Sequence, residues 1–455
     1  MNKYDVIILG AGPAGIASAK RLADFGKKLL IIDSSIGASY LQKGSVLSNS
    51  VLYYSYLYDI FQSKIRNFLN IDAKDVSIDL KKLKKQIDNI RNKLSKTFIN
   101  EISNHQNIDI CHSEAEFASE KSVLADGKEF FFENLIIATG SNPINLKTTN
   151  KINFLSLENF LNVKSIPEKI AIIGGGYIGV EIAMIFKRFG SQVIIIEKND
   201  RLLKDFDDFI VKKFEDNIKK DGVEVLKNCY PDKIEKIGNK TIIFLCNGEQ
   251  IETNEIFVAI GRKPNIDNLK LENAQIKLTK DGNIKLNRYL QTTNKSVYVI
   301  GDATGFNMFV NWSYKSSEIV CENILGGKKS YKNVIIPKLI YSDPEIAGIG
   351  LTEIEAKNQK YDYGVVKYNY ADVEKSAILG YSKGIIKVIF DKKSNRVIGA
   401  HILGKSASEL INVFGLMIQL KVDVDKMKEC IFNNPLFASI LTDISEAIKE
   451  KISDS

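Results

Sequence analysis

One local pattern occurs twice in this chain of 455 residues, and it restricts the possible folds more than any other feature. Residues 4–33 and 168–197 each read as an apolar strand, a Gly-x-Gly-x-x-Gly turn, a helix, a Phe-Gly pair, a second apolar strand and a terminal acid. Each shared position recurs 164 residues later, as between Gly10 and Gly174. The repeat is typical of the βαβ unit that binds a dinucleotide, so we expect two such sites.

The glycines and the acid of each unit have distinct physical roles. The first glycine permits a tight turn, the second lets a pyrophosphate approach the backbone, and the third lets the helix pack closely on the strand. The start of the helix supplies free N–H groups and a partial positive charge for phosphates, and the acid accepts hydrogen bonds from a ribose diol. We therefore expect one site to contain Gly10, Gly12, Pro13, Ala14, Gly15 and Asp33, and the other to contain Gly174, Gly176, Tyr177, Ile178, Gly179 and Glu197.

Two dinucleotide sites in one chain indicate an enzyme that passes electrons between two cofactors. The expected pair is FAD and a nicotinamide nucleotide. Glu197 bears on the choice of nicotinamide, because a carboxylate pairs with a 2′-hydroxyl and repels a 2′-phosphate. We therefore expect NADH to be preferred over NADPH, although the nearby cations Lys198 and Arg201 oppose part of this preference.

The composition is that of an ordinary folded protein. Of the residues, 44% are apolar and 26% are charged, and the length suggests about three domains. No run of about 18 apolar residues predicts a transmembrane helix. The net charge of +8 is spread along the chain, so we expect no nucleic-acid surface. An odd number of cysteines and no pattern of an export signal favour a cytoplasmic protein.

Cysteine and histidine are scarce in this chain. The five cysteines are Cys111, Cys229, Cys246, Cys321 and Cys430. They form no Cys-x-x-Cys pair, and no spacing matches a zinc or iron site, so we expect no metal centre. We expect the thiols to be structural and buried in apolar surroundings.

Three further motifs follow strands along the chain. They are Ala138-Thr139-Gly140-Ser141-x-Pro143, Gly261-Arg262-x-Pro264-Asn265, and Thr293-x3-Val297-Tyr298-Val299-Ile300-Gly301-Asp302. With these motifs the chain resembles the pyridine nucleotide–disulfide oxidoreductases over nearly its whole length. The resemblance implies that the first glycine unit belongs to an FAD site and the second to an NAD site.

The resemblance also assigns roles to individual residues. The FAD site would include Ala138, Thr139, Gly140, Gly301 and Asp302, and Asp302 would contact the ribityl chain. Gly261 and Arg262 would close the NAD-binding domain. Tyr177 would gate the nicotinamide pocket, and Glu181 would lie near the flavin and the nicotinamide.

The fold implied by the resemblance is α/β, with two Rossmann-like dinucleotide-binding domains for FAD and NAD and a C-terminal α+β dimerisation domain. The FAD-binding domain is expected at residues 1–150 and again at 268–333. The NAD-binding domain is expected at residues 151–267, and the interface domain at 334–455. A homodimer is expected because the site of this family is shared between subunits.

Local patterns predict three features of the C-terminal third. Two apolar runs, residues 385–390 and 397–402, flank a polar turn and predict a hairpin. Ser406 and Glu409 have the spacing of a capping box that begins a helix. Residues 439–452 carry apolar side chains at helical spacing.

The redox centre of the family is where this sequence departs from the pattern. Its family string is Gly-Gly-x-Cys, four residues, Cys, then x-Pro-Ser-Lys. At the same spacing, Tyr40 and Ser45 stand in place of the two cysteines, Leu47 in place of the proline and Asn49 in place of the lysine that pairs with the helix glutamate. Near the C-terminus, Asn434 and Ser439 replace the family's general-acid histidine and its glutamate.

These replacements exclude a disulfide relay on chemical grounds. A relay needs two sulfurs that cycle by thiolate attack, and its histidine must titrate near neutrality. We therefore predict an NADH-dependent FAD oxidoreductase that passes electrons directly to a small acceptor, such as a quinone or oxygen. Tyr40, Ser45 and Asn434 of the partner subunit would line the acceptor pocket, and together with Glu181 and Tyr177 they are the candidate catalytic residues.

Two alternatives remain open. A soluble transhydrogenase is similar in its Phe-Asn-x-Pro string, here residues 432–435, and in a tyrosine like Tyr314, whereas Glu197 opposes the NADPH half of its reaction. A catalytically silent nucleotide-binding scaffold or sensor fits the lost catalytic residues. The presence of both glycine turns and their acids opposes this second alternative.

Overall fold

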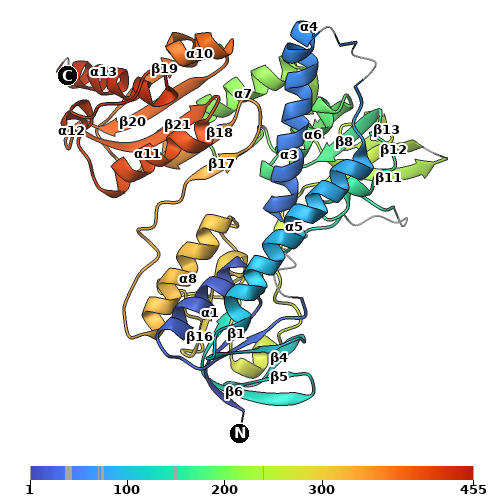
Figure 1. Cartoon of the computed structure of the whole chain (residues 1–455), viewed down its shortest axis with the longest axis vertical. Helices are drawn as coiled ribbons and strands as arrows, with labels where there is room; N and C mark the ends of the chain where they lie inside the picture. The colour runs from blue at the N-terminus through green and yellow to red at the C-terminus, as the bar shows by residue number, and fades with distance from the viewer. Residues whose placement is uncertain are drawn as a thin grey trace.

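The computed structural model of the chain describes residues 2–35, 44–69, 71–72, 76–146, 152–238 and 240–453. Its sheets gather in three bodies (Figure 1). The N-terminal sheet lies at the bottom of that view, the second glycine unit at the upper right and the C-terminal sheet at the upper left.

The first glycine unit forms the centre of the N-terminal sheet. The elements are β1 (Lys3–Leu9), α1 (Pro13–Asp24), β2 (Leu29–Ile32), β3 (Ile108–Cys111), β4 (Ala115–Ser119), β5 (Ser122–Ala125), β6 (Lys128–Ile137) and β16 (Val297–Val299). The strand order is β3-β2-β1-β6-β5-β4, and β16 also pairs with β6. Since β1, β2, β3, β6 and β16 are parallel, the carboxyl ends of β1, β6 and β16 meet at one edge, where a ligand of such a sheet binds.

The second glycine unit repeats this arrangement in a smaller parallel sheet. Its elements are β8 (Lys169–Ile173), α6 (Tyr177–Arg188), β9 (Gln192–Ile196), α7 (Asp208–Lys220), β10 (Val223–Leu226) and β14 (Glu255–Val258). The order is β10-β9-β8-β14, so β8 is flanked as β1 is in the first sheet. A three-stranded antiparallel sheet packs on one face through a shared apolar core, and its strands are β11 (Pro231–Ile237), β12 (Lys240–Leu245) and β13 (Gln250–Thr253).

A short antiparallel pair joins the two units. Its strands are β7 (Ser141–Pro143) and β15 (Arg262–Pro264). Each strand directly follows a motif glycine, Gly140 or Gly261, and forms the next part of the same motif. Two motifs that are far apart in the sequence therefore lie side by side.

The C-terminal body is an antiparallel sheet with helices. It comprises β17 (Lys338–Ile340), β18 (Ile346–Gly350), α9 (Glu353–Asn358), β19 (Tyr363–Asn369), α10 (Glu374–Leu379), β20 (Ile385–Asp391), β21 (Arg396–Leu403), α11 (Ala407–Gln419), α12 (Val424–Lys428) and α13 (Ile440–Ser453). The order β17-β18-β21-β20-β19 confirms the predicted hairpin, and α13 confirms the tail helix. The predicted capping box is wrong. Ser406 adopts a left-handed conformation (φ 59°), and its side chain makes no cap hydrogen bond.

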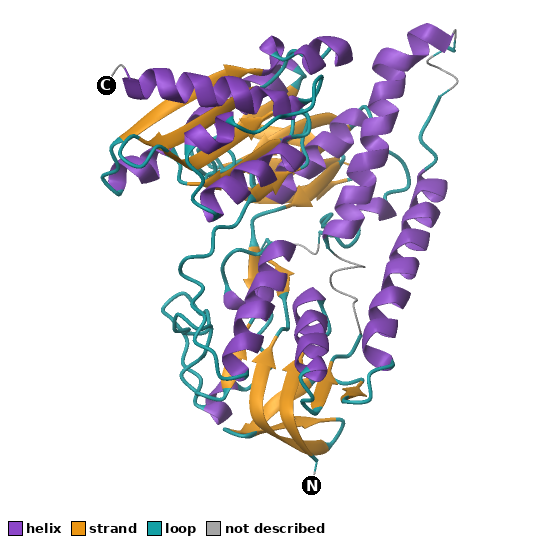
Figure 2. Ribbon diagram, turned by 60° about the vertical axis from the view of Figure 1, so that its left-hand side comes forward, coloured by secondary structure: helices purple, strands orange, loops and turns teal. Residues whose placement is uncertain are grey.

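The remaining long helices lie beside these bodies or run between them (Figures 1 and 2). They are α3 (Ser45–Ile60), which continues through a π-helical turn (Phe61–Ile65) into α4 (Arg66–Leu69), then α5 (Leu80–Ser103) and α8 (Val310–Ile324). Helix α8 lies against α1, where the hydroxyl of Ser18 donates to that of Ser317 at 2.8 Å. Helix α3 lies against α6. None of the helices in the described part of the chain has the length and apolarity that a membrane crossing requires.

A buried ion pair joins the second glycine unit to the C-terminal sheet. Lys387 on β20 lies 2.8 Å from Asp207, and both side chains are 3% exposed. The same ammonium lies 2.7 Å from Glu353 at the start of α9. Removal of one partner from such a buried pair is strongly destabilising, so this contact fixes the two bodies against each other.

Candidate active site

In the first glycine turn, the acid at the end of β2 binds the backbone of the turn. The N–H of Gly10 donates to the carbonyl oxygen of Ile32 at 2.9 Å. The carboxylate of Asp33 accepts hydrogen bonds from the N–H of Ala11 at 2.5 Å and from the N–H of Ser35 at 2.7 Å. The acid therefore holds the glycine turn and the end of β2 together.

The second turn repeats these hydrogen bonds residue for residue. The N–H of Gly174 donates to the carbonyl oxygen of Ile196 at 2.9 Å. The carboxylate of Glu197 accepts from the N–H of Gly175 at 2.7 Å and from the N–H of Asn199 at 2.8 Å. The sequence repeat is thus a repeat of backbone geometry.

Close packing explains the first and third glycines of each turn. A Cβ on Gly10, whose φ is +108°, would lie 2.4 Å from the carbonyl oxygen of Ala138, and one on Gly15 would lie 2.0 Å from the carbonyl oxygen of Gly10. The corresponding distances for Gly174 and Gly179 are 2.3 and 1.9 Å. By contrast, a Cβ in place of the second glycine of either turn would meet nothing within 4 Å. This open space beside a helix N-terminus is where a phosphate is expected to bind.

Both glycine turns open into one cavity of about 720 Å³. From the predicted FAD site, the cavity is lined by Gly10, Gly12, Pro13, Ala14, Asp33, Ala138, Thr139, Gly140, Gly301 and Asp302. From the predicted NAD site and its surroundings, it is lined by Gly176, Tyr177, Ile178, Glu181, Gly261 and Arg262. One space therefore joins residues that the sequence assigned to two cofactors.

A hydrogen-bond network fixes Asp302 at the wall of this cavity. The hydroxyl of Ser141 donates to Asp302 Oδ2 at 2.7 Å, and Arg262 Nε donates to the same hydroxyl at 2.7 Å. Arg262 Nη2 also donates to the carbonyl oxygen of Ser141 at 2.6 Å. Burial raises the pKa of Asp302, opposed by these two neighbours. The three motif strings therefore meet in one polar network.

Glu181 has an unusual environment for a carboxyl group. It lies on α6, is half-buried and lines the cavity. Burial raises the pKa of Glu181 to about 7, and the N–H of Tyr341, which donates to Oε1 at 3.3 Å, lowers it in part. Asn49, at the position of the family's lysine, lines the same cavity. Glu181 can therefore hold or release a proton near neutral pH.

Tyr177 begins α6 within an aromatic cluster at the cavity. Its ring centroid lies 5.5 Å from that of Phe206 and 5.0 Å from that of Phe309. Burial raises the pKa of the phenol well above its ordinary value, so the hydroxyl stays neutral. The ring packs as a neutral cover at the N-terminus of the second helix.

The remaining predicted residues do not line the cavity. Gly15, Gly174 and Gly179 support the turns from behind, and Glu197 is 7% exposed. Tyr40 lies outside the described residues, as does the side chain of Ser45, whose backbone begins α3. Asn434 is exposed and donates through Nδ2 to Glu374 Oε2 at 2.8 Å, so within its own subunit it contacts the C-terminal body. Tyr314 lines a different hollow, between α1 and α8.

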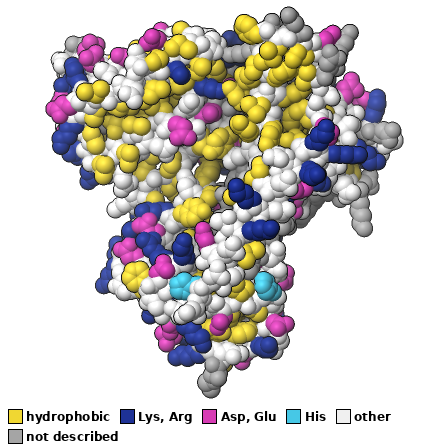
Figure 3. Space-filling model, viewed as in Figure 1, with side chains coloured by type: hydrophobic (Ala, Val, Ile, Leu, Met, Phe, Trp, Pro, Cys, Tyr) yellow, Lys and Arg dark blue, Asp and Glu magenta, His cyan; other side chains and the backbone are white. Residues whose placement is uncertain are grey.

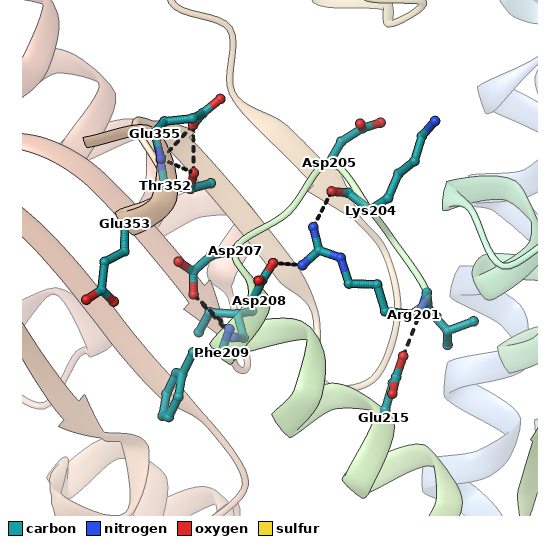
Figure 4. Close-up of polar contacts among 12 residues, drawn as sticks. Arg201, Lys204, Asp205, Asp207, Asp208, Phe209, Glu215, Thr352, Glu353 and Glu355 are labelled. Atoms are coloured by element: carbon teal, nitrogen blue, oxygen red, sulfur yellow. Dashed lines mark hydrogen bonds and ion pairs between the residues drawn. The ribbon is translucent and has the colours of Figure 1, made fainter. Parts of the chain in front are cut away.

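The loop that follows Glu197 carries Arg201, whose guanidinium contacts neighbouring groups of the same region (Figure 4). The guanidinium of Arg201 pairs with Asp208 and donates to the carbonyl oxygen of Lys204 at 2.6 Å. The N–H of Leu202 in turn donates to Glu215 at 2.9 Å. One of the two cations expected to oppose a preference for NADH is thus bound by other groups.

The expectation that all thiols are buried holds for two of the five, since two others are exposed and Cys111 is half-buried. Cys229 and Cys321 are buried, whereas Cys246 and Cys430 are exposed. Cys246 lies in the turn after β12, where its side chain reaches the surface. Within the described residues, no group of three or more potential ligands could hold a metal ion.

Sequence reasoning missed several residues that line the cavity. They are Gly44, Ser48, Ser141, Leu157, Asp205, Ala259, Ile300, Asn307, Met308, Phe309, Val310, Ser313, Lys338, Leu339 and Tyr341. Ser141 and Ile300 lie inside two of the motifs, and residues 307–310 follow Asp302 closely. Their proximity to a motif could therefore have indicated that they line the cavity. Lys338 and Leu339 come from β17 of another body, and Tyr341 directly follows that strand, so no pattern near the glycine turns marks them.

These features define a class: an α/β protein in which two glycine turns typical of dinucleotide binding open into one cavity. Residues 4–321 match the family "Pyridine nucleotide-disulphide oxidoreductase", and residues 336–444 match its dimerisation domain. The chain therefore belongs to the pyridine nucleotide-disulphide oxidoreductase family, and the predicted fold class is confirmed. Members of this family bind FAD and NAD(P)H.

Relatives with different activities resemble the chain over its full length. A dihydrolipoyl dehydrogenase of Buchnera aphidicola subsp. Schizaphis graminum is 33% identical, covering 99% of this chain and 96% of the relative. A mercuric reductase of Lysinibacillus sphaericus is 28% identical, covering 94% of this chain and 80% of the relative. The solved structure of the HOCl-induced flavoprotein disulfide reductase RclA from Escherichia coli is 25% identical with a TM-score of 0.88, covering 97% of this chain and 99% of that chain.

Proposed function

We propose that this protein is an NADH-dependent FAD oxidoreductase that passes electrons to a small acceptor without a redox disulfide. The observation that carries the proposal is the cavity shared by both glycine turns, which has no cysteine among its described lining residues. The sequence agrees, since Tyr40 and Ser45 occupy the positions of the family's two cysteines. Neither a phenol nor an alcohol can replace a thiolate in disulfide exchange.

Unpartnered polar atoms at the cavity support the binding of a large polar cofactor. Within the described residues, Thr139 Oγ1 and Asn49 Oδ1 are buried without a hydrogen-bond partner. Buried polar atoms are normally paired, so two such atoms on the wall of one cavity fit a ligand that supplies the missing bonds. The open space beside Gly12 and Gly176 fits the pyrophosphates of two dinucleotides.

Different residues of the cavity would bind FAD and cover the nicotinamide pocket. When bound, FAD supplies a two-electron carrier between NADH and the acceptor. Asp33 would accept a hydrogen bond from the adenosine ribose of FAD, and Asp302, held by Ser141, would bind the ribityl chain. Tyr177 would cover the nicotinamide pocket and exclude water until NADH displaces its ring.

Glu181 would manage the proton that accompanies electron transfer. Reduction of a quinone by NADH consumes one proton overall, as NADH, H⁺ and quinone give NAD⁺ and hydroquinone. A carboxyl group with a pKa of about 7 is half protonated at neutral pH and suits this role. The family's lysine would hold the carboxyl ionised, whereas Asn49 carries no charge.

The preference for NADH rests on Glu197. Its carboxylate lies at the end of β9 and would face a ribose diol, while a 2′-phosphate would meet like charge. Arg201 is bound to Asp208, which leaves less positive charge for a 2′-phosphate.

A homodimer completes the proposal. The chain has the family's dimerisation domain, and hydrophobic side chains gather over the C-terminal body and over α3 on one face (Figure 3). Leu416, Leu420 and Ile431 are 63%, 69% and 98% exposed, which is costly for apolar groups unless a partner covers them. The same assembly would bring Asn434 of the partner subunit to the acceptor pocket. The division into residues 1–150 and 268–333, 151–267 and 334–455 accords with the return of β16 to the N-terminal sheet.

Anaerobic mixing with NADH and with NADPH tests the function. We expect NADH to bleach the flavin absorbance of the holoenzyme, and quinones or oxygen to restore it. Rapid turnover of lipoamide would contradict the absence of disulfide chemistry. Hydride exchange from NADPH to an NAD analogue would favour the transhydrogenase, and binding of NADH without bleaching would favour a silent scaffold or sensor.

A further inference from the structure

Two cysteines that are 17 positions apart in the sequence lie against each other beside the second glycine unit. The sulfur atoms of Cys229 and Cys246 are 3.6 Å apart. Cys229 follows β10 and is 3% exposed, within the apolar core between the parallel and antiparallel sheets. Cys246 lies in the exposed turn between β12 and β13. A disulfide needs an S–S distance of about 2.0 Å, so a small movement of the exposed turn would allow the bond.

The backbone connects this pair of thiols to the acid of the nucleotide site. The N–H of Cys229 donates to the carbonyl oxygen of Glu197 at 3.0 Å, and the N–H of Asn228 donates to the carbonyl oxygen of Asn199 at 2.9 Å. Asn199 in turn donates to the carboxylate of Glu197. The N–H of Cys246 donates to the carbonyl oxygen of Tyr230 at 3.0 Å, next to Cys229. A displacement of Cys229 therefore acts directly on the residue expected to bind the ribose of NADH.

We propose that Cys229 and Cys246 form a thiol–disulfide site that responds to peroxides and weakens the binding of NADH when oxidised. The exposed thiol of Cys246 reacts first, since hydrogen peroxide oxidises it to a sulfenic acid and releases one water. The sulfur of Cys229 then attacks that sulfur, the S–O bond breaks, and the thiol proton leaves with the hydroxyl group as a second water. Overall, two thiols and one peroxide give one disulfide and two waters.

The reverse step restores the active form. A dithiol reductant attacks the disulfide, forms a mixed disulfide and then closes its own ring, which returns both protein thiols. Burial raises the pKa of Cys229, so its thiol is a slow nucleophile near neutral pH and the site is expected to respond to sustained rather than brief exposure.

The test begins with a thiol count on the holoenzyme, treated with hydrogen peroxide and then denatured. The chain has five cysteines, and we expect three free thiols after oxidation and five after dithiothreitol. Peptide mapping should show the link between Cys229 and Cys246. The dissociation constant for the nicotinamide nucleotide, measured by calorimetry with NAD⁺, which binds the same site without reducing the flavin, should rise about fivefold on oxidation, as expected from the loss of one hydrogen bond.

Two matched variants separate this site from other thiols. Cys246→Ser changes an exposed side chain and should abolish both the link and the change in NADH affinity. Cys430→Ser removes the other exposed thiol and should leave both unchanged. The proposal is overturned if oxidation forms no link, if the response survives in Cys246→Ser, or if the link forms without changing the affinity for NADH. The effect on NADH rests on the proposed role of Glu197, whereas the thiol count does not, so the two failures are distinguishable.

Discussion

The two glycine units have nearly the same backbone but different surroundings. Asp33 and Glu197 accept the same pair of backbone hydrogen bonds, yet Asp33 lines the cavity, whereas Glu197 is 7% exposed and does not. The helix of the first unit begins with Pro13, and that of the second begins with Tyr177 in an aromatic cluster. We infer from the comparison that the repeated backbone geometry specifies how a dinucleotide is bound. The side chains around each turn specify which dinucleotide binds there and which reaction follows.

The largest expected effect distinguishes Gly179, which packs against a backbone carbonyl oxygen, from Gly176, which leaves open space for a phosphate. Gly179→Ala places a methyl group 1.9 Å from the carbonyl oxygen of Gly174, and should lower the free energy of unfolding by about 3 kcal/mol. Gly176→Ala meets no protein atom within 4 Å and should cost less than about 1 kcal/mol. Its methyl group would occupy the space for the pyrophosphate, so the affinity for NADH should fall about tenfold or more. Urea unfolding and anaerobic bleaching of the flavin measure the two quantities.

The same pair of substitutions in the first unit sharpens this result. Gly15→Ala should destabilise the protein as Gly179→Ala does, because its methyl group would lie 2.0 Å from the carbonyl oxygen of Gly10. Gly12→Ala should release FAD during purification while leaving the fold intact. If Gly12→Ala retained FAD and lost NADH instead, the assignment of the two units would be reversed.

Glu181 has no counterpart of its kind in the first unit, and its raised pKa gives the next effect. Because the pKa rises from 4.5 to about 7 on folding, the folded state loses stability as the pH increases from about 4.5 to 7. Glu181→Gln is neutral and nearly isosteric, so it should be more stable than the wild type by up to about 3 kcal/mol at pH 8, with a small difference at pH 5. Thermal unfolding of the holoenzyme at both pH values measures this.

A lysine at position 49, on the wall of the cavity that Glu181 also lines, provides the matched control. Asn49→Lys should lower the pKa of Glu181, because an opposite charge favours the carboxylate. Any pH dependence of acceptor reduction near pH 7 should then move to lower pH, and in Glu181→Gln it should disappear. An unchanged pH profile in both variants would remove Glu181 from the proton-transfer step.

The fold could be predicted from the sequence because the repeat is local. Each unit combines glycines that permit close backbone contacts with an acid that binds the turn. These residues lie within about 25 positions of one another, so the pattern can be recognised from the sequence alone. The composition of the cavity was less predictable. Lys338 on β17 and Tyr341 just after this strand reach it from another body, and the contact between Cys229 and Cys246 depends on how two sheets pack. The capping box does not form, since Ser406 takes a left-handed conformation instead of the extended one usual for an N-cap, and its side chain makes no cap hydrogen bond.

A smaller effect is expected for Glu197, the buried acid of the second unit, and it tests whether this residue selects NADH over NADPH. Glu197→Gln keeps the size of the side chain but replaces one carboxylate oxygen by an amide NH₂, which cannot accept from the N–H of Gly175 or Asn199. The affinity for NADH should fall about tenfold, while the affinity for NADPH should stay the same or rise. Asp33→Asn in the first unit should instead weaken FAD retention. Equal losses for NADH and NADPH would mean that Glu197 supports the turn without selecting the nucleotide.

The smallest expected effect concerns the cation held behind Glu197. Arg201 is bound by Asp208 and by the carbonyl oxygen of Lys204, so it is poorly placed to attract a 2′-phosphate (Figure 4). Asp208→Asn should release part of this hold and improve the affinity for NADPH about twofold, because exposed ion pairs contribute little. The double variant Asp208→Asn with Arg201→Gln should lose that gain. If the single variant leaves NADPH binding unchanged, repulsion by Glu197 alone accounts for the preference for NADH over NADPH. The burial of the acid would then be the difference between the two glycine units that sets this preference.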